Sequence, residues 1–148
     1  MDIVIGIGNE LRGDDGVGPY VVEAIPVRSG LETMTVHQLV PELAERIQAA
    51  QHVLFIDACV DCDEVCLARV KPSDHRGLAH AVSPSSLLHW TQRLFEATPE
   101  AWLLSIPGYS FGLGEPISPE TRKHLSEAQG RLDAWLTRDS LPCVVDGD

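Results

Sequence analysis

The first 25 residues combine a short apolar run, closely spaced glycines and two adjacent carboxylates. Residues 3–5 (Ile-Val-Ile) are typical of a buried β-strand. Gly6 and Gly8 permit a tight turn after it, because glycine has no Cβ to clash. Apolar residues then recur at helical spacing, at Val17, Val21, Val22 and Ile25. This strand–turn–helix order places Asp14 and Asp15 at one edge of a sheet, where open α/β folds bind ligands.

The rest of the chain alternates predicted strands with predicted helices. The strands cover residues 33–39, 53–56, 65–70 and 101–106, and helices start near Pro41, Ser83 and Ser118. The last two starts are Ser-Pro pairs, a capping residue followed by a proline in the first turn. We therefore predict an α/β fold with three layers, α/β/α, around a mostly parallel twisted sheet of about five strands. We expect one domain over residues 1–138 and a loose tail over residues 139–148.

Composition argues against several classes of function. A chain of 148 residues with 44% hydrophobic and 22% charged residues suits a single globular domain. The formal charge of −11 argues against nucleic-acid binding, which needs a basic surface. The sequence has no apolar run long enough to cross a bilayer and no signal-type start. We therefore expect a cytoplasmic protein that binds neither nucleic acid nor membrane.

Four cysteines leave two interpretations open. Cys59, Cys62 and Cys66 are spaced as C-x2-C-x3-C, and Cys143 lies near the end of the chain. Together they could hold a metal ion or a cluster, but a second CxxC pair, which makes a zinc ribbon recognisable, is missing. The alternative is a set of reduced thiols in and beside a strand. The sequence does not decide between these roles.

Two glycine motifs match known patterns only in part. Residues 6–8 (Gly-Ile-Gly) begin a dinucleotide fingerprint, but Leu11 stands where its third glycine belongs. Residues 108–112 (Gly-Tyr-Ser-Phe-Gly) have the letters of a serine-hydrolase elbow. Residues 113–116 (Leu-Gly-Glu-Pro) cannot form the helix that must follow such an elbow. Both motifs therefore give weak support to a nucleotide-binding or serine-hydrolase function.

Three side chains are the candidates for a functional site. Asp57 directly follows the apolar run 53–56, so we expect it at the same sheet edge as Asp15. Asp15 could instead cap the first helix, and Asp57 could be a solvated strand end. His80 precedes the helix start at Ser83, although five other histidines compete with it. Two carboxylates and an imidazole would form a mixed oxygen and nitrogen set for nickel or zinc.

The chain resembles the hydrogenase maturation proteases, endopeptidases that trim the large-subunit precursor of nickel–iron hydrogenases. The match lies in four segments: residues 6–18 (GIGNELRGDDGVG), 38–43 (QLVPEL), 54–58 (LFIDA) and 80–88 (HAVSPSSLL). The first segment is distinctive and the others support it. Residues 110–115 and 118–119 also resemble the family, so the likeness extends over most of the chain.

The resemblance implies a twisted sheet between helix layers and a metal-dependent endopeptidase activity. It carries the catalytic and metal-contacting roles to Asp15, Asp57 and His80, with His89 as the alternative histidine. The nickel would be supplied by the large-subunit precursor, and zinc or cadmium would replace it in a crystal. Cys59, Cys62 and Cys66 lie outside the family pattern. A non-catalytic nickel-handling protein and a nucleotide-binding regulatory module remain as alternative functions.

Overall fold

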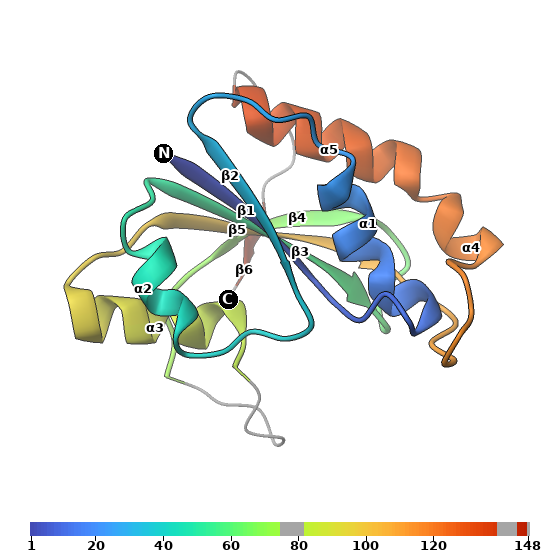
Figure 1. Ribbon diagram of the computed structural model, residues 1–148, viewed down its shortest axis with the longest axis horizontal. Helices are drawn as coiled ribbons and strands as arrows, with labels where there is room; N and C mark the ends of the chain where they lie inside the picture. Colours follow the sequence, from blue (N-terminus) through green and yellow to red (C-terminus); the bar gives the residue numbers. More distant parts are fainter. Residues whose placement is uncertain (75–81, 139–144, 148) are drawn as a thin grey trace.

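The computed structural model describes residues 1–74, 82–138 and 145–147, and it has three layers (Figure 1). The central layer is one sheet, made of β1 (Asp2–Ile7), β2 (Leu31–Val36), β3 (His52–Cys59), β4 (Cys66–Val70), β5 (Glu100–Pro107) and β6 (Val145–Gly147). The helices are α1 (Val17–Glu23), α2 (Leu43–Ile47), α3 (Pro84–Phe95), α4 (Pro119–Arg122) and α5 (Leu125–Thr137). Among the described residues, no helix has the length and apolar character needed to cross a membrane.

The sheet is mostly parallel, as predicted. Its strand order is β2-β1-β3-β5-β4-β6. The pairs β1–β2, β1–β3, β3–β5 and β4–β6 are parallel, and β4 is antiparallel to β5. The short strand β6 makes the sheet six-stranded, and its residues lie within the segment expected to be a tail.

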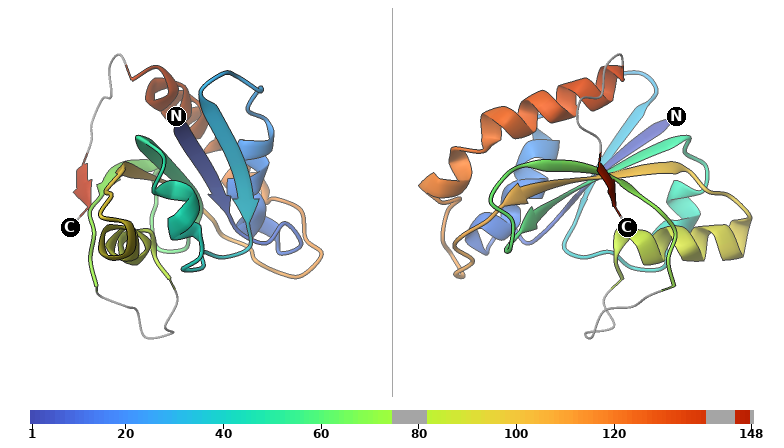
Figure 2. Two further views of the ribbon diagram at one scale, coloured as in Figure 1. Left: turned by 60° about the vertical axis from the view of Figure 1, so that its left-hand side comes forward. Right: turned by 180° about the vertical axis from the view of Figure 1, so that it is seen from behind.

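Helices cover both faces of the sheet, which confirms the three-layer prediction (Figure 2). On one face α1 and α5 pack on the sheet and share one apolar core, centred on Val4, Leu54, Leu104, Leu132 and Trp135. On the other face α2 and α3 bury a second core, centred on Ile5, Ile47, Phe55, Leu87 and Leu88. Continuous apolar runs in β1 and β3 are needed because these strands are buried from both sides.

The Ser-Pro pairs start helices as predicted. The Ser83 side chain accepts a hydrogen bond from the Ser86 amide at the start of α3, and Ser118 caps α4 in the same way. The burial of two residues in α3 differs from the prediction. Leu94 and Phe95, expected on the buried face of α3, are exposed because they lie in its last turn, before the left-handed residue Glu96.

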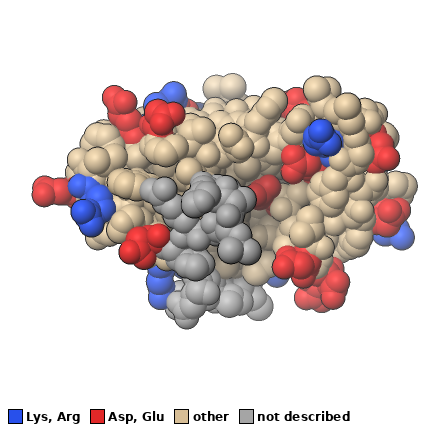
Figure 3. Space-filling view, turned by 90° about the horizontal axis from the view of Figure 1, so that it is seen from below, with Lys and Arg blue, Asp and Glu red and all other residues tan. Residues whose placement is uncertain are grey.

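The helix expected after Ser118 is divided into α4 and α5. The buried stripe of α5 is nevertheless the predicted one, with Ala128, Leu132 and Trp135 fully buried. Acidic side chains are spread over the face seen in Figure 3 rather than gathered in one patch. On this face the acidic charge is thus distributed, which agrees with a role in solubility.

Candidate active site

The carboxyl ends of β1 and β3 lie side by side and define the candidate site. In the parallel register Gly6 of β1 pairs with Ile56 of β3. After β1 the chain turns at Gly8, whose φ of +145° is a conformation that favours glycine. It then forms a 3-10 turn, Gly13–Gly16, and enters α1. A Cβ on Gly18 would stand 2.5 Å from the carbonyl oxygen of Ile56, so α1 approaches the end of β3 as closely as a glycine allows.

This packing brings Asp15 and Asp57 to a single cleft of about 350 Å³. Its walls come from the end of β1, the segment after β2, the end of β3 and the start of α3. The lining residues are Ile7, Gly8, Asp15, His37, Gln38, Leu39, Asp57, Val82, Ser83 and Pro84. The two carboxylates that the sequence placed at one sheet edge are therefore together in the structure.

Asp57 lies within β3, which continues to Cys59, rather than directly after the strand as the apolar run suggested. Pairing with β5 extends β3 as far as Cys59 opposite Pro107. Burial raises the pKa of Asp57 to about 7, and the negative charge of Asp15 adds to the rise. The hydrogen bond from the Ala58 amide (2.8 Å) acts in the opposite direction and lowers the pKa, but by less. Near neutral pH this carboxyl group can both accept and donate a proton.

Asp15 is held by the turn that follows β1. Its Oδ2 accepts a hydrogen bond from the Asn9 amide (2.7 Å). It does not cap the first helix: the residue at that position is Gly16, and no side-chain hydrogen bond is made there. The alternative role of Asp15 as a helix cap is therefore not observed, and its other oxygen has no hydrogen bond within the described residues.

Asp14, next to it, has a structural role that the sequence did not reveal. Its side chain is fully buried. Oδ2 accepts hydrogen bonds from the amides of Tyr109 and Ser110 and from the Ser118 hydroxyl, and Oδ1 accepts one from the Ser118 amide, all between 2.7 and 2.9 Å. Burial alone would raise the pKa of Asp14, but these bonds outweigh it and lower the pKa to about 2. Asp14 thus fastens both ends of the loop between β5 and α4.

The same loop contains the partial serine-hydrolase motif. The Ser110 hydroxyl donates a hydrogen bond to the Glu115 carboxylate, and the Asp14 amide donates to the Ser110 carbonyl oxygen. Ser110 is therefore part of the loop's own hydrogen-bond network. A nucleophilic serine instead needs a general base, such as histidine or lysine, within hydrogen-bond reach.

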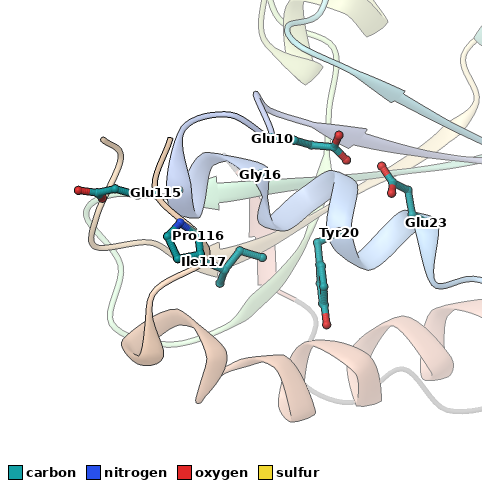
Figure 4. Close-up of a pocket in the computed structure, with 8 residues that line it drawn as sticks. Glu10, Gly16, Tyr20, Glu23, Glu115, Pro116 and Ile117 are labelled. Carbon is teal, nitrogen blue, oxygen red and sulfur yellow. The ribbon is translucent and has the colours of Figure 1, made fainter. Parts of the chain in front are cut away.

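A second, smaller hollow of about 210 Å³ lies beside α1 (Figure 4). Glu10, Tyr20, Glu23 and Glu115 are among its lining residues. Glu10 and Glu23 point toward one another, and their hydrogen bond, with some burial and charge repulsion, raises the pKa of Glu23. Neither Asp15 nor Asp57 lines this hollow, so it is separate from the cleft.

The histidine predictions have different outcomes. His80 lies outside the described residues, so its place in the site stays a prediction. His89 lies on α3 against Trp90 and does not line the cleft. His37, which sequence reasoning missed, does line it. No signal in the sequence pointed to it, because the predicted strand over residues 33–39 includes His37, whereas β2 ends at Val36.

No complete metal site is present within the described ranges, where no three His, Cys, Asp or Glu side chains are grouped to hold an ion. Cys59, Cys62 and Cys66 are free thiols, and the Cys59 thiol donates to Asp61 (3.2 Å). Cys143 lies outside the described residues. Cys59 ends β3 and Cys66 begins β4, and both interpretations of the cysteines stay open.

Solved structures of several hydrogenase maturation proteases have the same fold. HybD, a hydrogenase maturating endopeptidase from E. coli, superposes with a TM-score of 0.74 at 20% identity, over 94% of this chain and 93% of its own. HycI, a [NiFe] hydrogenase maturation protease from Thermococcus kodakarensis KOD1, has a TM-score of 0.71 at 20% identity, over 93% and 92%.

HybD from Thermococcus kodakarensis, also a [NiFe] hydrogenase maturation protease, has a TM-score of 0.70 at 21% identity, over 90% of this chain and 97% of its own. No family model and no curated protein matches the sequence. The similarity therefore lies in the arrangement of the elements over nearly the whole chain, at low sequence identity. The chain has the fold of the hydrogenase maturation proteases.

Proposed function

We propose that this protein is an endopeptidase that removes the C-terminal extension from the large-subunit precursor of a nickel–iron hydrogenase. The observation that carries the proposal is the pair Asp15 and Asp57 in one open cleft. The cleft lies at the carboxyl edge of a sheet whose fold is shared with endopeptidases of that function. The distinctive segment at residues 6–18 supplies Asp15 and supports the same assignment.

Nickel is part of the substrate in this proposal. Asp15, Asp57 and His80 contact a nickel ion that the precursor already carries, and the ion positions the scissile segment in the cleft. Carboxylate and imidazole groups are suitable ligands for nickel and for zinc or cadmium as its replacement. Only part of the coordination shell has to come from this chain, because the precursor keeps its own ligands.

Hydrolysis requires a water molecule to lose a proton as it attacks the scissile carbonyl, and the leaving amine to gain one. The Asp57 carboxylate oxygen that does not contact the nickel ion can accept the proton from the water and deliver it to the leaving amine. Asp15, with one oxygen fixed by Asn9, offers the other oxygen to the substrate. We place the reaction in the cytoplasm, with the precursor protein as partner.

The proposal predicts cleavage that depends on both nickel and Asp57. The test incubates the purified protein with nickel-loaded and nickel-free large-subunit precursor from the same organism and follows the mass of the precursor. The wild type should shorten the nickel-loaded form only. Asp57→Asn should lower the rate by about 10²–10⁴-fold, whereas Asp133→Asn, on the exposed side of α5, should cleave like the wild type.

Two results would contradict this function. Equal cleavage of the nickel-free precursor would remove nickel from recognition, and a folded Asp57→Asn protein with wild-type activity would remove Asp57 from the reaction. A wild type that binds the precursor without shortening it would instead identify a non-catalytic nickel-handling protein.

A further inference from the structure

His37 reaches the site from a strand that the sequence motifs do not include. It directly follows β2, whose last residue, Val36, accepts a hydrogen bond from the Gly8 amide (2.8 Å). This bond ties the end of β2 to the turn after β1, next to the cleft. His37 therefore lines the same cleft as Asp15 and Asp57.

The imidazole of His37 is available to a ligand. It is exposed, and it has no hydrogen bond or ion pair within the described residues. His52, by contrast, bonds to Asp2 at 2.9 Å. Across the cleft the Ser83 hydroxyl is already engaged with Ser86 at the start of α3.

The chemistry of this wall suits a peptide substrate. An imidazole can donate a hydrogen bond from one ring nitrogen and accept one at the other, and the carboxylates of Asp15 and Asp57 in the same cleft offer acceptors. A bound peptide presents both carbonyl oxygens and N–H groups, so it needs both kinds of partner. His37 is exposed whereas Asp57 is half-buried, so His37 lies nearer the solvent side of the cleft.

We propose that His37 is a substrate-contacting residue, whose imidazole binds the metal-bearing segment of the precursor at the β2 side of the cleft. This inference rests on the proposed function and adds a binding residue to it. Its role is affinity rather than proton transfer, which the proposed function assigns to Asp57. His37 variants should therefore change KM and leave kcat nearly as it is.

The test compares wild type, His37→Ala, His37→Gln and the control His52→Gln. Steady-state cleavage of the nickel-loaded precursor should show a KM about tenfold higher in His37→Ala, the size of one lost hydrogen bond to a charged or polar partner. His37→Gln should recover part of the loss, because glutamine also donates and accepts. His52→Gln should resemble the wild type, since glutamine can keep the bond to Asp2.

Binding is measured separately, with each His37 variant combined with Asp57→Asn so that the precursor is not consumed. The Kd should rise by the same factor as KM. Unchanged KM and Kd in His37→Ala would overturn the inference and leave the proposed function in place, as would a fall in kcat alone. A wild type that binds the precursor through His37 but never cuts it would overturn the protease function only, and a failure to bind would overturn both.

Discussion

The carboxyl group of Asp57 is held where its charged form is unfavourable. Its folded-state pKa of about 7 lies above its ordinary value of 3.8, so the folded protein binds this proton more tightly than the unfolded chain. The free energy of unfolding that this tighter proton binding contributes is fully present below about pH 4 and is lost as the pH rises through 7. A carboxyl group with a pKa near neutral pH therefore costs folding free energy when it is ionised.

Asp57→Asn should be more stable than the wild type at pH 8, by about 2–4 kcal/mol, and nearly equal to it at pH 4. Asparagine stays uncharged at both pH values and can still accept the Ala58 hydrogen bond. Denaturant unfolding at the two pH values measures the difference. Asp133→Asn, on an exposed helix surface, should show no such pH-dependent gain; an equal gain there would contradict the explanation.

Asp14 presents the opposite case, a buried carboxylate whose charge is required. Asp14→Asn should lower the free energy of unfolding at pH 7 by about 2–4 kcal/mol, because the new amide meets N–H donors that need an acceptor. The pKa of about 2 implies that the wild type loses this stability as the pH falls from about 4 to 2. Unfolding curves at pH 7 and pH 3 check both statements. Between these pH values the free energy of unfolding should fall less in Asp14→Asn than in the wild type, because asparagine does not titrate.

For Asp14, Asp15 and Asp57, the sequence predicted where the carboxylates lie better than what each of them does. Asp15 and Asp57 could be placed together because each follows or ends an apolar strand, and parallel strands share an edge. The role of Asp14 could not be predicted, since its partners Tyr109, Ser110 and Ser118 are about a hundred residues away. Hydrogen bonds over such a separation depend on the finished fold. His37 was not singled out for a simpler reason. The apolar–polar alternation of residues 33–39 predicts a strand that includes His37, whereas β2 ends at Val36.

At the scale of elements, the turn between β1 and α1 depends on glycines at fixed places. Gly8→Ala should destabilise the protein by more than about 3 kcal/mol and move Asp15, because a Cβ there would lie 1.8 Å from the carbonyl oxygen of Asp15. Gly130→Ala is the matched control. It lies inside α5 with open space around it and should stabilise the protein by about 0.5–1 kcal/mol.

Thermal unfolding of both variants is the measurement, with precursor cleavage as a second readout. A tolerated Gly8→Ala would show that the turn can relax away from Asp15.

The helices and strands themselves were largely predictable because local signals sufficed: apolar runs for β1 and β3, and Ser-Pro starts for α3 and α4. The antiparallel direction of β4 and the addition of β6 depend on long-range pairing and left no local signal.

For the whole molecule, the two carboxyl groups with the largest pKa changes, Asp14 and Asp57, predict the shape of the pH–stability curve. Asp14 raises stability as the pH increases from about 2 to 4, and Asp57 lowers it from about 4 to 7. Repulsion within a chain of charge −11 adds to the decline at high pH. We expect maximal stability between about pH 4 and 6, measured by unfolding at a series of pH values. Stability that rose steadily from pH 5 to 8 would contradict this balance.

The anchoring of the loop between β5 and α4 has a consequence for how such a protein diversifies. Asp14 fixes Ser110 and Ser118 at its two ends, while Leu113 and Pro116 between them are exposed. Side chains at Leu113 and Pro116 can therefore change without touching the hydrogen bonds that Asp14 makes. Gly112 and Gly114 in the same loop cannot change as freely, because a Cβ on Gly112 would stand 2.6 Å from the Glu115 carboxylate and Gly114 has a φ of +82°. Variation in this loop is thus confined to particular positions rather than open to the whole segment.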